Sequence, residues 1–265
     1  MLNKRGQVTL FVIAAIILVV GAAIVFSVRQ GAIKIPVSQE EAQKIVSGQV
    51  QPISDVVAKC TEGPVKEATK NIGLQGGFCS PVPVRAISFG ELSLPYLVET
   101  SGVNHILSLN GSVHTVSAEI LMCTNMTEII QCIDHFNSFK KVVDVKELGN
   151  MDITMHFSQT SPLVTVTVNY PLEISRGGAK TLIEQMRFNF KSGLQAAHAA
   201  AVVVTNSQST THDFDYVTYL RANANRGNVP KVSGQLVDPH RLDYYILTVP
   251  AEDEDPYMFN FAVEK

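Results

Sequence analysis

An uninterrupted apolar segment near the N-terminus is the feature that most constrains this chain. Between Val8 and Val28 no side chain is ionisable, and only Thr9 and Ser27 are polar. About 20 helical residues, each rising about 1.5 Å, cross a hydrocarbon core of about 30 Å. The segment is therefore predicted to be a helix in apolar surroundings, with the rest of the chain outside the bilayer.

The flanking charges favour a cytoplasmic N-terminus, since Lys4 and Arg5 precede the segment while Arg29 and Lys34 come after it more sparsely. A cleaved secretory signal is one alternative, but its apolar region is usually about 7–15 residues and ends in a small-residue cleavage site. A helix buried in a soluble core is the other alternative, but such a helix normally has a polar face. Length and composition therefore favour a membrane or assembly helix.

The composition of the chain limits the kind of domain that can come after the helix. The 265 residues suffice for one sizeable core, and 46% of them are hydrophobic against 17% charged. The formal net charge is −3, with Lys and Arg scattered, so the chain lacks the basic patch of a nucleic-acid-binding protein. Neither repeats nor a long linker divides it, and a single domain is predicted.

The residues from Lys4 to Phe11, directly followed by the apolar helix, resemble the class III signal peptide of archaeal type IV pilin-like proteins. The resemblance implies a cytoplasmic leader that is cut between Gly6 and Gln7. The remaining helix would stay in the membrane or bundle with copies of itself in a filament. Many pilins carry Glu at the fifth mature position, where this chain has Phe11.

Small side chains along the apolar helix permit close packing of helices, although they are also frequent in single anchors. The residues predicted to form such an assembly helix are Leu10, Phe11, Ala14, Ala15, Gly21 and Ala22.

The later sequence is similar to a broader group of uncharacterised surface proteins of small-genome archaea, which brings no known reaction with it. The matching stretches are Cys60, Leu74 to Gly77, Pro95 and Tyr96, Cys132, Asn169 to Leu172, and Phe259 to Val263.

Helices are expected in four regions after the connector. Ser38 and Glu41 form a capping box that opens a short helix ending near Gly48. A second helix is expected from Pro52, broken or kinked at Gly63–Pro64, with its second piece ending at Gly73. Apolar spacing predicts one helix over Ser117–Ile133. Another begins near Ser192 and runs to Val204, where the polar tract Asn206–Thr211 ends it.

Strands are expected where apolar and polar residues alternate, as in an antiparallel sheet with one buried face. The turn Arg176–Gly178 leads from one of them into a strand through Phe188 and Phe190. Asn110–Gly111 is typical of a hairpin, while the related proteins favour a loop there. The expected strands are Val84–Phe89, Val142–Val145, Ile153–Phe157, Leu163–Tyr170, Tyr244–Val249 and Met258–Val263.

The four cysteines favour two disulfides over a metal site, because no pair has Cys-x-x-Cys spacing. If Ser117–Ile133 is one helix, Cys123 and Cys132 are about 13.5 Å apart, too far for a bridge. Two pairings then remain. The similar surface proteins carry one cysteine in each of two helices, which implies Cys60 with Cys132 and Cys79 with Cys123.

Two other short motifs concern modification or metal binding. Asn110–Ser112 and Asn125–Thr127 are acceptor sequons for N-glycosylation. His212 with Asp213 and Asp215, and the acidic run Glu252–Asp255, are interpreted as solvated loops rather than metal sites. Neither a cofactor nor a phosphate-binding loop is indicated, and an enzyme is not expected.

The sequence thus predicts an α+β protein with segments 1–6 (leader), 7–30 (apolar helix), 31–37 (connector) and 38–265 (disulfide-bonded extracellular domain). The expected function is that of a pilin-like structural subunit of a surface filament or tube, located at the membrane or in the filament. The alternative is a single-pass surface protein that binds another surface protein or a host cell without polymerising.

Overall fold

The computed structural model describes Leu18 and residues 38–79, 84–89, 92–111, 114–158, 161–223, 230–238, 242–250 and 256–264. Apart from Leu18, the predicted leader, apolar helix and connector lie outside these residues. Within the described part of the chain, none of the helices has both the length and the hydropathy needed to cross a membrane.

A single long helix, α2 (Gln39–Leu74), replaces the three helical pieces expected from the sequence. Its start is as predicted: the Ser38 side chain accepts a hydrogen bond from Glu41 N, and the Glu41 carboxylate accepts one from Ser38 N. The predicted breaks are wrong, because Pro52 and Pro64 both lie inside the helix. A proline costs about 3 kcal/mol in a helix interior, and burial of a continuous apolar face along α2 offsets that cost.

An antiparallel sheet packs against α2, as the alternating sequence predicts. Its long hairpin consists of β5 (Leu163–Arg176) and β6 (Ala179–Lys191). Gly177 and Gly178 form the turn with positive φ angles of 55° and 87°, a conformation that glycine adopts without strain. The other edge of β5 pairs with β4 (Asp152–Phe157) and, further along, with β3 (Asp144–Glu147).

The helix expected over Ser117–Ile133 is in fact two helices, α3 (Val116–Cys123) and α4 (Met126–Ile133). Thr124 is extended, with ψ 128°, and its hydroxyl bonds back to Ile120 O. Asn125 then caps α4 by accepting a hydrogen bond from Glu128 N. Side chains that cap a new helix compete with helix continuation, and this pair separates α3 from α4. A 3-10 helix, η1 (Asp134–Phe139), comes next.

A second sheet has the strand order β1-β2-β9-β8-β7. Its strands are β1 (Ala86–Phe89), β2 (Leu92–Val98), β7 (Lys231–Asp238), β8 (Leu242–Val249) and β9 (Tyr257–Glu264). The strand expected over Val84–Phe89 is present as β1. Strand β2 was not predicted, because it contains Pro95 and proline argues against a strand. Beyond Pro95, Tyr96 and Val98 pair in parallel with β9.

Helix α5 (Leu194–Thr211) covers one face of this second sheet, and α6 (Tyr216–Asn223) comes after it. The prediction that the polar tract ends α5 is wrong, since the helix runs through it. The hydroxyls of Thr210 and Thr211 bond back to the carbonyls of Asn206 and Ser207, at 2.8 Å each, so these side chains do not compete for the helix N–H groups. The helix ends instead at His212, with φ 54°.

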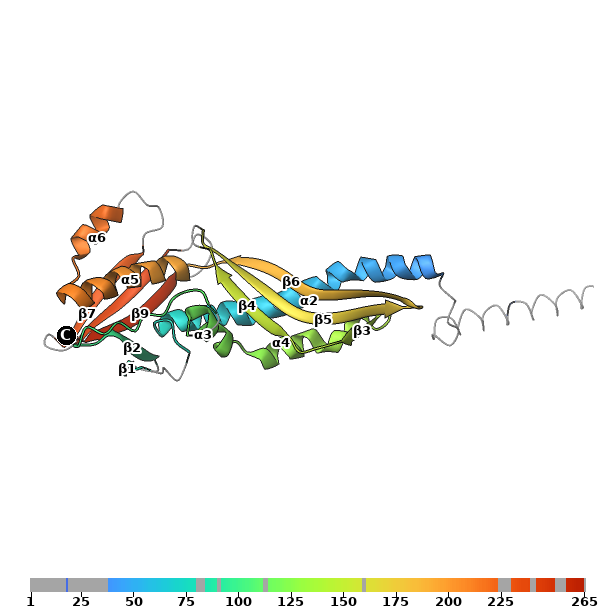
Figure 1. Cartoon of the computed structure of the whole chain (residues 1–265), viewed down its shortest axis with the longest axis horizontal. Helices are drawn as coiled ribbons and strands as arrows, with labels where there is room; N and C mark the ends of the chain where they lie inside the picture. The colour runs from blue at the N-terminus through green and yellow to red at the C-terminus, as the bar shows by residue number, and fades with distance from the viewer. Residues whose placement is uncertain are drawn as a thin grey trace, which may run out of the picture.

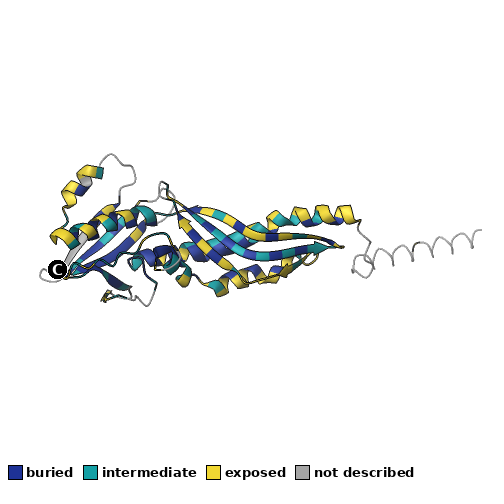
Figure 2. Cartoon of the chain, in the orientation of Figure 1, coloured by how far each residue is buried: buried dark blue, intermediate teal, exposed yellow. Residues whose placement is uncertain are grey.

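The described body is elongated (Figure 1). We call α2, α3, α4 and β3–β6 the trunk, and β1, β2, α5, α6 and β7–β9 the head. The trunk begins with α2 at one end of the long axis, and the head occupies the other end. Buried residues form a continuous core through both regions (Figure 2).

Tyr257 on β9 joins the two regions. Its hydroxyl donates a 2.7 Å hydrogen bond to Thr69 O of α2, and its side chain is buried beside Gly73 and Gly193, where a Cβ atom would overlap it. The two glycines therefore permit the close approach of helix, sheet and the β6–α5 connection.

Candidate functional site

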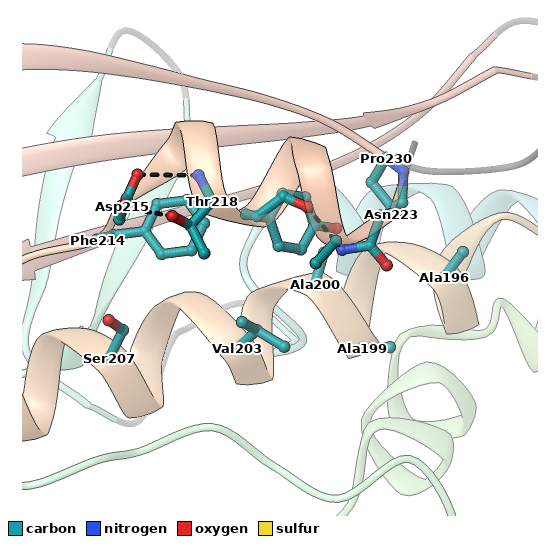
Figure 3. A pocket seen from close by; sticks show the side chains of 12 residues that line it. Ala196, Ala199, Ala200, Val203, Ser207, Phe214, Asp215, Thr218, Asn223 and Pro230 are labelled. Carbon is teal, nitrogen blue, oxygen red and sulfur yellow. Dashed lines mark hydrogen bonds between the residues drawn. The ribbon is translucent and has the colours of Figure 1, made fainter. Parts of the chain in front are cut away.

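A groove of about 550 Å³ lies between α5 and α6 in the head. Figure 3 shows Ala196, Ala199, Ala200 and Val203 along the α5 side, with Ser207 further along the same helix. Phe214 and Tyr219 line it from the α6 side. The volume falls in the range of small-ligand sites, about 300–1,000 Å³, and the lining is mostly apolar.

Small residues on α5 leave the groove open. An α-helix that exposes alanine toward a neighbouring helix fills little space. On the α6 side, the rings of Phe214 and Tyr219 lie 5.6 Å apart. Val203, which lines the groove, is 48% exposed. The groove therefore presents apolar surface to solvent at the end of the molecule farthest from the start of α2.

The polar groups at the rim of the groove already have partners within the chain. Asp215 accepts hydrogen bonds from Thr218 N at 3.0 Å and Thr218 Oγ1 at 2.6 Å, and these bonds hold the pKa of its carboxyl group below its ordinary value. Ser207 Oγ donates to Asp213 O, and Asn223 Nδ2 donates to Tyr219 O. These polar groups are therefore satisfied within the chain, and the rest of the lining is mostly apolar.

Buried side chains with hydrogen-bond partners lie beneath α5. The buried ring of His198 contacts Leu107 O through Nε2 at 2.6 Å and meets Phe259 edge-on. Burial lowers the pKa of His198 below its ordinary 6.5, so the ring is neutral near pH 7. Gln208 Nε2 donates to Tyr245 Oη at 2.6 Å, and burial raises the pKa of Tyr245 to about 12.

The residues considered for metal binding do not converge. His212 ends α5 and Asp215 caps α6, and the described residues contain no group of three His, Cys, Asp or Glu side chains arranged to hold an ion. The acidic run Glu252–Asp255 lies outside the described residues.

The cysteines form the two bridges that the resemblance implies. Cys60 is joined to Cys132 and Cys79 to Cys123, each with a Cα–Cα distance of 5.6 Å. The first bridge fixes α2 to α4, and the second fixes the turn after α2 to the end of α3. Two disulfides in one chain indicate an oxidising compartment.

The two predicted glycosylation sequons differ in geometry. Asn110 is half-buried, and both its side-chain atoms bond to Phe157 of β4. Asn125 is exposed at the gap between α3 and α4. The hairpin suggested by Asn110–Gly111 is not found in the described residues, where Leu109 to Gly111 lie in a loop.

The leader residues Gly6 and Gln7 and the predicted assembly helix, from Leu10 to Ala22, lie outside the described residues except for Leu18. Sequence reasoning missed the groove because α6 was not expected. The aromatic residues Phe214 and Tyr219 were the available signal, but they are five residues apart, which is not a helical spacing, and the eight residues of α6 give weak periodicity. No family model, curated protein or solved structure matches this chain.

Proposed function

We propose that this protein is a cell-surface protein held by its N-terminal apolar segment, in which the trunk acts as a stiff spacer that carries the head away from the surface. The observation that best supports this proposal is the elongated body, with the start of α2 at one end and the head at the other (Figure 1). An anchor preceding Ser38 would leave the α5–α6 groove at the far end.

The construction of the trunk supports a spacer role. Helix α2 has 36 residues, which at about 1.5 Å per residue give a rod of about 54 Å. The hairpin β5–β6 runs along the helix. One disulfide fixes α2 to α4, and a second fixes the turn after α2 to α3. Such a body resists bending, whereas a linker of similar length without secondary structure would not.

The head supports a binding role rather than a catalytic one. Exposed apolar surface rimmed by polar groups marks interaction sites, and the groove between α5 and α6 combines both. Its occupant would be an apolar group of a molecule met outside the cell.

A pilin-like filament subunit is the second candidate. The leader from Lys4 to Phe11 and the small residues of the apolar helix favour it. In such an assembly the apolar helices would form the core, and the trunks would form the outer wall. The capping box at Ser38 is compatible with both candidates, since in either case the body begins as a separate helix.

One experiment separates these candidates. Extracellular material sheared from cells would be viewed by negative-stain microscopy and identified by mass spectrometry, alongside a detergent extract of the membranes. The spacer proposal expects a membrane-bound protein that detergent releases as a discrete particle, with or without its first six residues. Filaments composed mainly of this chain, beginning at Gln7, would instead establish the second candidate.

A further inference from the structure

The amide of Asn110 takes the place of a neighbouring strand at the end of β4. Its Oδ1 accepts a hydrogen bond from Phe157 N at 2.7 Å, and its Nδ2 donates one to Phe157 O at 2.9 Å. Phe157 is the last residue of β4 and its ring is buried. Asn110 therefore satisfies both backbone groups of a residue that fixes the core beneath it.

A sugar on Asn110 is incompatible with this pairing. The N–H and C=O of Phe157 point to the same side, so Asn110 meets them with Oδ1 and the Nδ2 hydrogen that lies on the Oδ1 side. Glycosylation makes the amide secondary, and the trans form preferred by such amides puts the substituent on the oxygen side. The sugar would replace the hydrogen that Phe157 O accepts and would separate the loop from β4.

Asn125 offers the opposite arrangement. Its Oδ1 accepts a hydrogen bond from Glu128 N at 3.2 Å, and its Nδ2 has no hydrogen-bond partner within the described part of the chain. Both Asn125 and Thr127 are exposed. A sugar on Nδ2 leaves the oxygen free to cap α4.

Apolar side chains exposed on either side of this sequon give a second indication. Met122, three residues before Asn125, is 73% exposed, and Ile130, five residues after it, is 49% exposed. A glycan between them would shield apolar surface that is otherwise in contact with water.

We propose that Asn125 is the N-glycosylated residue of this protein and that Asn110 is a structural residue which remains unmodified in the folded chain. The co-reactant is a lipid-phosphate-linked oligosaccharide. Nδ2 of Asn125 bonds to the anomeric carbon of the first sugar, the bond from that carbon to the phosphate oxygen breaks, the lipid phosphate leaves, and Nδ2 loses one proton. The inference rests on the proposed function, because the sugar donor is used outside the cytoplasm.

The test uses the full chain expressed in a cell that N-glycosylates its surface proteins, with glycopeptide mass spectrometry. Thr127→Ala removes one sequon without touching the Asn125 cap, and Ser112→Ala removes the other as the matched control. We expect one glycan on the parent chain, its complete loss in Thr127→Ala, and an unchanged mass shift in Ser112→Ala. A glycan on Asn110, or an unmodified Asn125, would overturn the proposal.

A second variant tests the structural role of Asn110. Asn110→Asp keeps a similar shape but replaces the donor to Phe157 O by an oxygen, so its melting temperature should be lower than that of the parent chain. Thr127→Ala leaves this pairing intact, so its melting temperature should equal that of the parent chain when both are measured without the glycan. Equal melting temperatures of Asn110→Asp and the parent chain would contradict the role given to Asn110.

Labelling of intact cells with a membrane-impermeant reagent separates the glycan proposal from the proposed surface function. A surface-exposed chain with a bare Asn125 refutes the glycan alone, and an internal chain refutes both.

Discussion

The trunk and the head are stabilised in different ways. In the trunk, one disulfide joins α2 to α4, and the other joins the turn after α2 to the end of α3. The head, in its described part, depends on an aromatic cluster around Phe259, Phe261 and Tyr245 and on the helix α5 that covers it. The stability of the trunk should therefore depend mainly on its disulfides, whereas the stability of the head should depend on its side-chain packing and on pH.

Removal of the bridge between Cys60 and Cys132 should have the largest effect. The bridge closes a loop of 72 residues, for which loop entropy predicts a loss of about 4 kcal/mol in the free energy of unfolding. Cys60→Ala/Cys132→Ala should therefore expose trunk amides to hydrogen exchange before head amides. Uniform loss of protection in both regions would show that the trunk and head unfold as one unit.

The joint between the regions should be sensitive to a single methyl group. Gly73→Ala would place Cβ against the Tyr257 hydroxyl and Met258 O, and overpacking of this kind costs about 1–3 kcal/mol. Gly63→Ala is the matched control on the same helix: its Cβ would meet nothing within 4 Å, and alanine should stabilise the helix by up to about 1 kcal/mol. Urea denaturation measures both, and a stable Gly73→Ala would refute the close approach.

Acid should destabilise the head through His198. Burial lowers the pKa of this ring in the fold, so the unfolded chain binds a proton more readily. Stability is full above the unfolded pKa of about 6.5 and falls as pH drops toward the folded pKa, by up to about 1.4 kcal/mol per pH unit. His198→Asn should remove this slope in pH-dependent melting curves. A slope unchanged by the substitution would assign it to another group.

The smallest predicted effect concerns the end of α5. His212 is exposed and has a left-handed conformation, with φ 54°, which is unfavourable for residues that carry a Cβ atom. His212→Gly should raise the free energy of unfolding by about 0.5–1 kcal/mol, because glycine is favoured after a helix C-terminus. Thermal melting checks this, and a destabilised variant would mean that the imidazole makes a contact of its own.

Local patterns in the sequence predicted the parts of the fold that depend on neighbouring residues. The capping box at Ser38, the alternation in Leu163–Tyr170 and the turn at Gly177–Gly178 are of this kind, and each is present in the structure. Features set by tertiary packing could not be predicted: α2 continues through Pro64 because its apolar face is buried, and β2 accepts Pro95 because the residue precedes its pairing with β9.

The candidate sites likewise depend on tertiary packing that the sequence does not reveal. The sequence identifies Asn110 and Asn125 as equivalent sequons, and the structure distinguishes them by the pairing of Asn110 with Phe157 and the exposure of Asn125. The groove arises where the Ala-rich side of α5 meets Phe214 and Tyr219 of a helix too short to be recognised by its periodicity.

The most direct test of the account is labelling of exposed trunk lysines on intact cells with a membrane-impermeant amine reagent, followed by fractionation. Lys44 and Lys146 are exposed in the described structure and should be labelled before lysis, while the protein stays with the membranes or surface filaments in high salt. Labelling of these lysines only after lysis, or release of the protein by salt alone, would contradict an anchored body outside the cell.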